Sequence, residues 1–507
     1  MVWGLIAGME FRGTRDIMDQ TALFVGTRNG LGQVEATLEA ATRPPAIVAS
    51  LFIDELSSTR GKFLEHAIER LLKGHAPDVG LICLPSCESG LLVRIRTILR
   101  KHRVADRFLP AADDLLAGVG PRSEQEIDFR ALLDRPDRPL DVESIKSLLQ
   151  DRRVLITGAG GSIGRELARI VAEHAPETLV LMDRCEHALF EVDRRIARWH
   201  PDLERVASLQ DVADPEGTKR LFCKARPHVV LHAAAHKHVP LSESHPAEAV
   251  RNNLAGSISA VHAAMASGAE KFVLVSTDKA ASPQNVMGAT KRLAELAVQR
   301  IAADGGMSVS VVRFGNVLGS SGSVLEIWKD ELREGGPITV TDPNMSRYLM
   351  TIPEAAGLVL QAAAYRELDA SPGLVNVLDM GEPVSILDLA GRFLRLHGFE
   401  PVLPESPADG VKGGQMPIVF TGIRPGEKMH EILIRPGGIL EETDHPAIQA
   451  WIGPLPPRGQ TYSVLERVMV QASSLNASVA AGEVFAGLEA LDTGDPAPIV
   501  HSHLPAI

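Results

Sequence analysis

The sequence contains few cysteines, few aromatic residues and no long apolar run. Only 4 of the 507 residues are Cys, too few and too scattered for the disulfide framework of a secreted protein. Phe, Trp and Tyr together make up 4% of the chain. The apolar start, Met1 to Met9, is far shorter than the roughly 18 residues that a membrane span requires, and it lacks the basic region of a signal peptide. We therefore expect a cytoplasmic protein.

Basic residues are outnumbered by acidic ones, 52 against 64, which gives a net charge of −12. Because negative charge repels phosphate backbones, we expect no nucleic-acid partner. Two groups of residues could suggest a metal: Cys83 with Cys87, and His232 with His236 and His238. Neither group has the further ligands of a zinc site. We therefore predict no bound metal.

Two segments open with an apolar strand, a glycine-containing turn and a helical pattern, which is typical of a Rossmann-like, doubly wound α/β unit. The first of them, Thr21 to Gly32, departs from the usual glycine spacing, so we favour a structural or regulatory role there over nucleotide binding. The predicted domains are residues 1–120, Rossmann-like; 121–150, a linker with one short helix at Val142 to Leu149; 151–455, a second Rossmann-like domain with a smaller C-terminal substrate subdomain; and 456–507, one helix at Tyr462 to Leu475 and a tail.

The second opening predicts a dinucleotide site. The strand Val154 to Ile156 runs directly into Thr157 to Gly164, whose G-x-x-G-x-x-G spacing lets backbone N–H groups approach a pyrophosphate. The next strand ends in Asp183, which can accept hydrogen bonds from an adenosine ribose and so favours NAD, whereas Arg184 keeps NADP possible. The predicted cofactor-binding residues are Gly158, Gly161, Ser162, Ile163, Gly164, Asp183, Arg184, Asp211, Val212, Ala233, Ala234, Lys237, Asn252 and Lys291.

A third pattern predicts chemistry at the carboxyl end of the sheet. The buried strand Phe272 to Val275 delivers Ser276 to Lys279 to the edge where open α/β folds bind ligands. A helix that begins at Asn285 carries Met287 and Lys291, one turn apart. From spacing alone, the neighbours Asp278 and Lys279 could be an acid and a base or only a surface ion pair.

Residues 154 to about 435 resemble the extended short-chain dehydrogenase/reductase superfamily and, within it, the CapD-like nucleotide-sugar 4,6-dehydratases of polysaccharide biosynthesis. Met287 stands where the superfamily usually has Tyr, as in the long members of that family. The first 150 residues resemble the non-catalytic domain of the membrane-anchored members, so we expect a soluble variant or a form that starts after the anchor. The resemblance rests on 157–164, 232–240, 252–253, 276–279, 285–292, 312–324, 347–348 and 421–428.

The resemblance implies an NAD(P)-dependent dehydration of a UDP-N-acetylhexosamine, with UDP-N-acetylglucosamine as the expected substrate. C4 is oxidised, water leaves across C5 and C6, and hydride returns to C6. Thr277 would contact the C4 oxygen, Asp278 would protonate the departing hydroxyl, and Lys279 would remove the C5 proton. Met287 would replace the phenol and Lys291 would hold the nicotinamide ribose. The implied substrate-binding residues are Lys237, His238, Asn316, Ser320, Ser323, Val324, Arg347, Arg424 and Glu427.

Two other functions remain open from the sequence. A C4 or C5 epimerase would use the same cofactor but would release no water. A non-catalytic, nucleotide-sugar-binding regulatory protein would also fit the irregular first glycine loop. The resemblance further implies a homo-oligomer, because members of the superfamily commonly pair through two long helices, here about Pro246 to Ala266 and Asn285 to Ala303.

Overall fold

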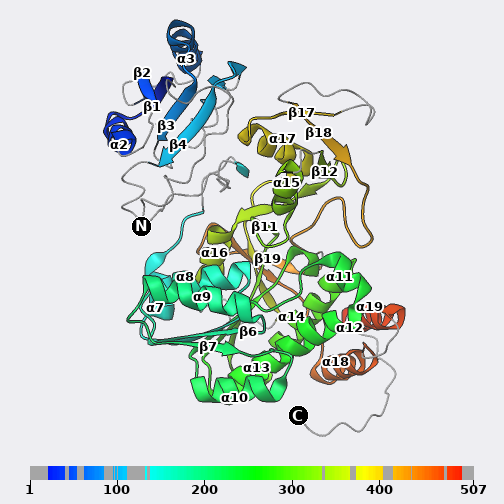
Figure 1. Ribbon diagram of the computed structural model, residues 1–507. Helices are drawn as coiled ribbons and strands as arrows, with labels where there is room; N and C mark the ends of the chain where they lie inside the picture. Colours follow the sequence, from blue (N-terminus) through cyan, green and yellow to red (C-terminus); the bar gives the residue numbers. More distant parts are fainter. Residues whose placement is uncertain are drawn as a thin grey trace. The chain divides into compact units, whose positions relative to one another are not determined.

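The computed structural model describes most of the chain and divides it into two compact units, shown in Figure 1. One unit comprises Met1–Arg135 with Leu389–Ile418, and the other comprises Pro136–Asp388 with Val419–Ile507. The sequence analysis did not anticipate that the 389–418 segment groups with the N-terminal residues. The described residues are 21–39, 45–53, 62–84, 95, 98–99, 101–110, 132–133, 138–333, 337–365, 373–403, 415–435, 437–472 and 477–493.

The N-terminal unit contains a four-stranded parallel sheet in the order β2-β1-β3-β4. This order is that of a doubly wound α/β fold and agrees with the predicted Rossmann-like unit. A side chain at Gly26 would clash with the carbonyl oxygen of Cys83, so this glycine allows close strand packing. Cys87 lies outside the described residues. The elements are β1 (Thr21–Gly26), α2 (Arg28–Glu39), β2 (Ala46–Phe52), α3 (Lys62–His75), β3 (Val79–Leu84) and β4 (Ala105–Pro110).

The larger unit is built on a nine-stranded sheet in the order β19-β20-β15-β10-β9-β8-β5-β6-β7. Seven of these strands are parallel in the Rossmann order, which confirms the predicted fold class, and β20 and β19 add an antiparallel edge. The strands are β5 (Arg153–Thr157), β6 (Thr178–Asp183), β7 (Arg205–Leu209), β8 (Val229–His232), β9 (Lys271–Val275), β10 (Ser308–Arg313), β15 (Leu374–Leu378), β19 (Ile439–Glu442) and β20 (Ile448–Ile452).

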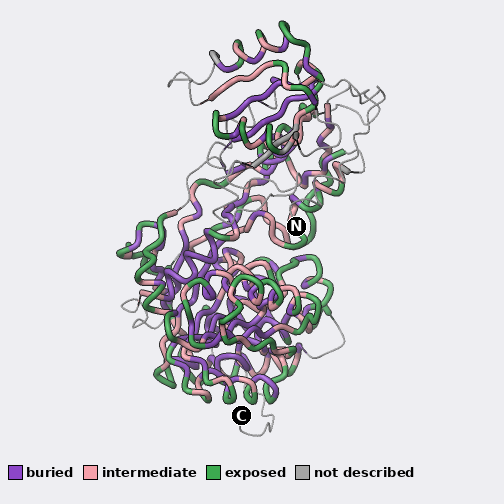
Figure 2. The backbone as a smooth tube through the Cα atoms, turned by 60° about the vertical axis from the view of Figure 1, so that its left-hand side comes forward, coloured by how far each residue is buried: buried purple, intermediate pink, exposed green. Residues whose placement is uncertain are grey.

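Helices cover both faces of this sheet, and alternate strand residues therefore enter two different cores. In β5, Val154 and Ile156 pack towards α7, α8, α9 and α16, whereas Leu155 packs towards α10, α13 and α14. Burial on both faces explains why the strands read as continuous apolar runs, and Figure 2 shows buried backbone through the middle of this unit. The helices are α7 (Val142–Leu149), α8 (Ser162–Glu173), α9 (Glu186–Trp199), α10 (Pro215–Ala225), α13 (Gly256–Ser267), α14 (Val286–Gly305) and α16 (Ile352–Ala364).

The segment past Gly315, for which a substrate subdomain is predicted, forms short strands and helices. Two small strand pairs, β11 with β14 and β13 with β16, bring residues near 316 and 347 to the carboxyl end of the main sheet. The elements are β11 (Asn316–Leu318), α15 (Val324–Arg333), β12 (Ile338–Val340), β13 (Ser346–Arg347), β14 (Leu349–Thr351) and β16 (Val384–Ser385). They are followed by α17 (Ile386–Leu396), β17 (Glu400–Val402) and β18 (Gln415–Phe420), whose residues 389–418 group with the N-terminal unit.

Two predicted helices differ in the structure. The helix expected at 246–266 is divided into α12 (Pro246–Ala249), a π-helical turn η3 (Val250–Ala255) and α13, preceded by the short α11 (Val239–Ser244). The C-terminal region has two helices, α18 (Arg458–Ala472) and α19 (Ala477–Thr493), where the sequence analysis expected one helix and a tail. Residues 494–507 lie outside the described chain.

The second C-terminal helix has a packing reason. Ala480, Val484, Leu488 and Leu491 recur one turn apart on α19 and are buried together with residues of α18 and α14. In Figure 1, α18 and α19 lie beside α12 and α14, in agreement with their contacts. Among the described residues, no helix combines the length and the apolar character needed to cross a membrane.

Candidate functional site

The glycine loop after β5 has the geometry of a phosphate-binding turn. Gly158 has a positive φ of 66°, and a Cβ atom there would lie 2.7 Å from the Ala234 backbone. A Cβ at Gly164 would clash with the Gly158 carbonyl oxygen. Glycine is therefore required where the loop, α8 and the 233–234 turn meet. The loop ends at Gly161, the N-cap of α8, so that the first N–H groups of that helix face the loop.

Asp183 lies at the end of β6 and orders the loops around it. Its Oδ2 accepts a hydrogen bond from the Gly160 N–H at 2.9 Å, and its Oδ1 accepts one from the Cys185 N–H at 2.8 Å. The neighbouring Arg184 contacts the ring of His236 and lies 3.5 Å from Glu248. The carboxylate is thus placed where a ribose is expected, while the positive charge of Arg184 is partly neutralised.

A second charged group surrounds Asp211, which follows β7. Arg251 donates to its Oδ2 at 2.8 Å and also pairs with Glu248 at 3.3 Å. The next residue, Val212, is buried and packs with a core of α10 and α13. The two predicted cofactor residues at this strand end therefore lie at the same sheet edge as Asp183.

The three histidines of the 232–238 segment do not converge. His232 is fully buried between Thr157 Oγ1, 2.7 Å from its Nδ1, and Ser257 Oγ, 2.9 Å from its Nε2. Burial, assisted by the charge of Lys291, lowers the pKa of His232 to about 3, so the ring is neutral. No group of three or more His, Cys, Asp or Glu side chains is arranged for a metal in the part of the chain that the structure describes.

Asn253, on the π-helical turn η3, holds the 233–238 loop in place. Its Oδ1 accepts from the His236 N–H at 2.7 Å, and its Nδ2 donates to the His236 carbonyl at 3.1 Å and to Thr290 Oγ1 at 3.2 Å. Asn252, the predicted cofactor residue, is buried and donates to Asn253 Oδ1. Asn253 is part of the family motif at 252–253 but was not predicted as a site residue. Its role depends on contacts between separate loops, which the local sequence does not show.

The residues after β9 gather an acid, an amine and a hydroxyl. Asp278 is fully buried, and its Oδ1 accepts from Thr277 Oγ1 at 2.8 Å and from Lys279 Nζ at 3.0 Å. Lys279 Nζ also donates to Asn316 Oδ1 at 3.1 Å. Oδ2 of Asp278 is buried and has no hydrogen-bond partner. Two predicted site residues, Asp278 and Asn316, therefore contact the Lys279 amine, and Thr277 joins the group through Asp278.

Helix α14 carries the remaining predicted catalytic pair. Asn285 caps its N-terminus by accepting from the Gly288 N–H at 2.8 Å, and Met287 and Lys291 are buried. Lys291 Nζ donates to the Val275 carbonyl at 2.7 Å, at the end of β9. Burial lowers the pKa of Lys291 to about 8, although the charge of Glu295 opposes the shift.

Beneath this helix lies a buried ion cluster that the sequence analysis did not find. Glu295 accepts from Ser276 Oγ at 2.6 Å, from Arg313 at 2.5 and 2.8 Å, and from Arg292 at 3.1 Å. Burial raises the pKa of Glu295, but the two guanidinium groups more than reverse that effect and hold it below its usual range. Both guanidinium groups also lie over the ring of Trp451. The cluster joins α14, β9, β10 and β20.

The loop at 320–324 lies against the cofactor loop. The Ser321 N–H donates to Ser162 Oγ at 3.0 Å, and Lys237 Nζ donates to Ser320 Oγ at 3.2 Å. His238 packs so closely on Gly322 that a Cβ there would lie 2.7 Å from the ring. The Ser323 N–H donates to the Ser320 carbonyl at 2.9 Å, and Val324 begins α15. The structure thus brings these predicted residues together.

Arg347 and Arg424, the two arginines among the expected substrate-binding residues, are both engaged within the chain. Arg347 is buried and donates to the carbonyls of Ser346, Met429 and Lys428 at 2.7, 3.0 and 2.8 Å. Arg424 is exposed and pairs with Glu427 at 2.7 Å. Their binding roles remain predictions. The observed contacts make Arg347 a support of the 428–429 backbone.

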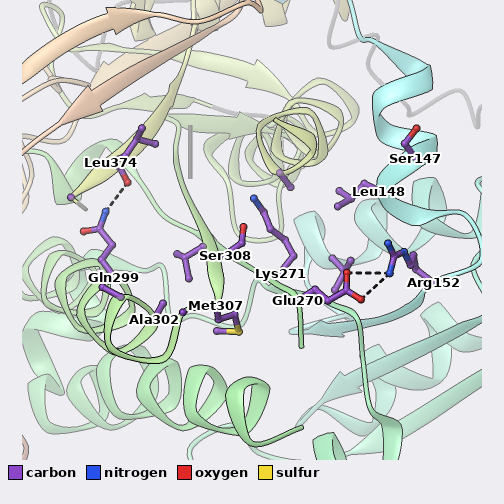
Figure 3. Close-up of a pocket in the computed structure, with 16 residues that line it drawn as sticks. Ser147, Leu148, Arg152, Glu270, Lys271, Gln299, Ala302, Met307, Ser308 and Leu374 are labelled. Atoms are coloured by element: carbon purple, nitrogen blue, oxygen red, sulfur yellow. Dashed lines mark hydrogen bonds and ion pairs between the residues drawn. The ribbon is translucent and has the colours of Figure 1, made fainter. Parts of the chain in front are cut away.

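A cavity of about 570 Å³ lies elsewhere in the larger unit, as Figure 3 shows. Lys271, Ser308 and Leu374, at the amino ends of β9, β10 and β15, line it together with Arg152 and Glu270, which form an ion pair of 2.9 Å. The predicted catalytic residues follow the carboxyl ends of the strands. This cavity is therefore at the opposite edge of the sheet.

The parallel sheet, the glycine loop and the groups gathered after β9 are those of the extended short-chain dehydrogenase/reductase superfamily. Within it, the chain belongs to the polysaccharide biosynthesis protein family, whose sequence model matches residues 154–452. The X-ray structure of Pen from Bacillus thuringiensis is similar, with a TM-score of 0.52 and 29% identity over 61% of this chain and 89% of that one.

Curated relatives include the probable polysaccharide biosynthesis protein EpsC of Bacillus subtilis, 40% identical over 73% of this chain and 59% of its own length. The match thus spans less than two thirds of that relative. A UDP-N-acetylglucosamine 4,6-dehydratase (inverting) of Campylobacter jejuni is 29% identical over 57% of this chain and 78% of its length. A UDP-glucose 4-epimerase of Rickettsia akari is 30% identical over 56% of this chain and 78% of its own length.

Proposed function

We propose that the chain is an NAD-dependent UDP-N-acetylhexosamine 4,6-dehydratase, with UDP-N-acetylglucosamine as the expected substrate, that acts in the formation of glycan precursors. The observation that carries this proposal is the cluster of Thr277, Asp278 and Lys279 beside a helix with Met287 in place of a phenol. A Campylobacter relative is named as such a dehydratase. The resemblance to an epimerase makes C4 epimerisation the alternative, but the phenol normally used at this position is replaced by a thioether.

The residues present fit a dinucleotide. The turn from Gly158 to Gly164 packs so closely that a side chain at 158 would clash with the Ala234 backbone and one at 164 with the Gly158 carbonyl. Its bare backbone and the N-terminus of α8 suit a pyrophosphate. Asp183 would hold the adenosine ribose, and Lys291 the nicotinamide ribose. We expect NAD rather than NADP, because Arg184 is already engaged by Glu248. When bound, the cofactor supplies reversible oxidation at C4 of the sugar.

The chain's own residues would divide the elimination between them. An amine acts as a base only when neutral, and a carboxyl acts as an acid only when protonated. The 3.0 Å contact between Lys279 Nζ and Asp278 Oδ1 lets one proton move from the amine to the carboxylate, which prepares both groups at once. The C5 proton then passes to Lys279, the electron pair forms the C5–C6 double bond, and the C6 hydroxyl leaves as water with the proton of Asp278.

Mass spectrometry of the sugar nucleotide tests this function directly. The protein is incubated with UDP-N-acetylglucosamine and NAD in deuterated water. We expect the product to lose one water, about 18 Da, and to gain one deuterium at C5. We expect Lys279→Met and Asp278→Asn to abolish the loss of water while NAD still binds. A product of unchanged mass that separates from the substrate by chromatography would instead indicate an epimerase, and no reaction would exclude this substrate.

A further inference from the structure

A second buried carboxylate contacts the proposed base from a distant part of the sequence. Glu431 is only 6% exposed. Its Oε1 lies 3.8 Å from Lys279 Nζ, and its Oε2 lies 3.3 Å from Lys428 Nζ. Charges therefore alternate along four side chains, Asp278, Lys279, Glu431 and Lys428, of which the two carboxylates are buried and the two amines are partly buried. Neither Glu431 nor Lys428 was among the residues predicted from the sequence.

Several hydrogen bonds hold the segment that carries Glu431 against the loop of residues 276–285, which contains Asp278 and Lys279. Lys428 Nζ donates to the Ser282 carbonyl at 2.5 Å, and Asn285 Nδ2 donates to the Gly426 carbonyl at 3.0 Å. Arg347 donates to the carbonyls of Lys428 and Met429. Gly426 itself has a positive φ of 79° and packs closely against Asn285 and α11. Glu431 is thus fixed relative to Lys279.

We propose that Glu431 is a positioning residue for Lys279, which holds the amine in place and stabilises the ammonium that forms when Lys279 accepts the C5 proton. This inference rests on the proposed function. Asp278 cannot fill that role at the start of the elimination, because it must then be protonated and neutral. Asn316 offers Lys279 a dipole and no net charge. Glu431 supplies the negative charge, as a triad carboxylate does for its protonated base.

Lys428 explains how a second carboxylate can remain buried there. An isolated buried charge is costly, whereas a buried pair compensates much of that cost. The Glu431–Lys428 pair is already neutral before the reaction. Glu431 can therefore stabilise the new positive charge on Lys279 without a large rearrangement of the site. Preorganised charge of this kind is most effective in a site that excludes water.

The test compares Glu431→Gln with the wild-type chain and uses substrates deuterated at C5 or at C4. We expect kcat to fall on the order of 100-fold, while KM and the Kd for NAD change less than about twofold. The isotope effect of C5 deuterium on kcat should rise and that of C4 deuterium should fall, because proton removal becomes rate-limiting. Glu431→Asp keeps the charge and should recover part of kcat. Glu441→Gln, an exposed carboxylate on β19, serves as the matched control.

Three outcomes would overturn the inference. The first is an unchanged kcat in Glu431→Gln. The second is a sign of a general structural role, either a lower kcat with both isotope effects unchanged or a loss of NAD binding in both Glu431 variants. The third is a wild-type chain that releases no water from the sugar, which removes the proposed function as well. Water loss by the wild type with an unaffected Glu431→Gln refutes only the role of Glu431.

Discussion

At the scale of single residues, Lys291 makes the cofactor site sensitive to pH. Burial lowers the pKa of its amine to about 8, so Lys291 is charged below that pH and neutral above it. The nearby His232 is neutral throughout this range, and Glu295 has its charge neutralised by two arginines. The loss of the positive charge of Lys291 should therefore appear as a pH-dependent change in the Kd for NAD.

We predict that NAD binds more weakly as the pH rises through about 8. A hydrogen bond from a charged group contributes about 1.5 to 3 kcal/mol, so the Kd should rise roughly 10- to 100-fold when the charge is lost. Titrations of NAD between about pH 6.5 and 9.5 measure this change. Lys291→Met should bind weakly at every pH and show no such transition. A Kd of the wild type that is constant over this range would refute the assignment.

Glu295 matters for stability because it is the carboxylate between two buried guanidinium groups. We predict that Glu295→Ala lowers the free energy of unfolding by about 3 to 5 kcal/mol, since it leaves uncompensated charge in the core. Urea unfolding followed by tryptophan fluorescence measures this, because Trp451 lies under both arginines. Glu173→Ala, which removes an exposed partner of Arg169, should cost less than about 1 kcal/mol. Equal effects would contradict the special role of the cluster.

At the scale of elements, the turn between β5 and α8 depends on backbone contact. Gly164 lies in the first turn of α8, directly over Gly158, and a methyl group would force helix and loop apart. The same turn forms the expected pyrophosphate site. A single carbon added at Gly164 should therefore weaken both the packing of α8 and the binding of the cofactor.

We predict that Gly164→Ala abolishes detectable NAD binding and lowers the melting temperature. The matched control is Gly482→Ala on α19, where an added Cβ meets no atom within 4 Å. That change should stabilise the helix by about 0.5 to 1 kcal/mol. Calorimetry and NAD titration of the two variants measure the difference. Normal NAD binding by Gly164→Ala would show that the turn does not hold the dinucleotide.

At the scale of the whole molecule, the C-terminal helices cover part of a helix that the resemblance expects to take part in pairing. Of the two helices expected to pair, α14 packs against α18 and α19, and most of its residues are buried within this single chain. Leu293, Leu296 and Ala297 lie in the same apolar cluster as Val484 and Leu488. The α18–α19 pair thus covers this apolar face of α14 within a single chain.

We predict that the intact chain does not associate through α14, whereas a chain that ends at Pro457 does. Removal of α18 and α19 exposes the apolar residues of α14 and η3, and an exposed apolar surface of this kind promotes association. Light scattering coupled to size-exclusion chromatography compares the two chains. A substitution Val484→Asp in the intact chain should have the same effect more weakly. Equal masses for all three proteins would contradict this role of the helices.

The main sheet and the local motifs were predictable from the amino-acid sequence. Apolar runs, glycine spacing and strand-end polar residues predicted β5, β6, β8 and β9, the turn at 158–164, Asp183 and the group at 277–279. These features are recoverable because strand burial, turn conformation and the carboxyl edge of a parallel sheet depend on short stretches of chain. The resemblance then assigned chemistry to residues that local spacing had already selected.

The distant groups that complete that site became visible only in the folded chain. Glu431 follows Lys279 by about 150 positions, and nothing in its own segment indicates that it is buried beside that amine. Glu295, the partners of Arg347 and the packing of α19 are likewise set by contacts between separate elements. A buried charge is stable only where opposite charges from other segments surround it. The sequence therefore specified the local geometry, and packing selected the partners.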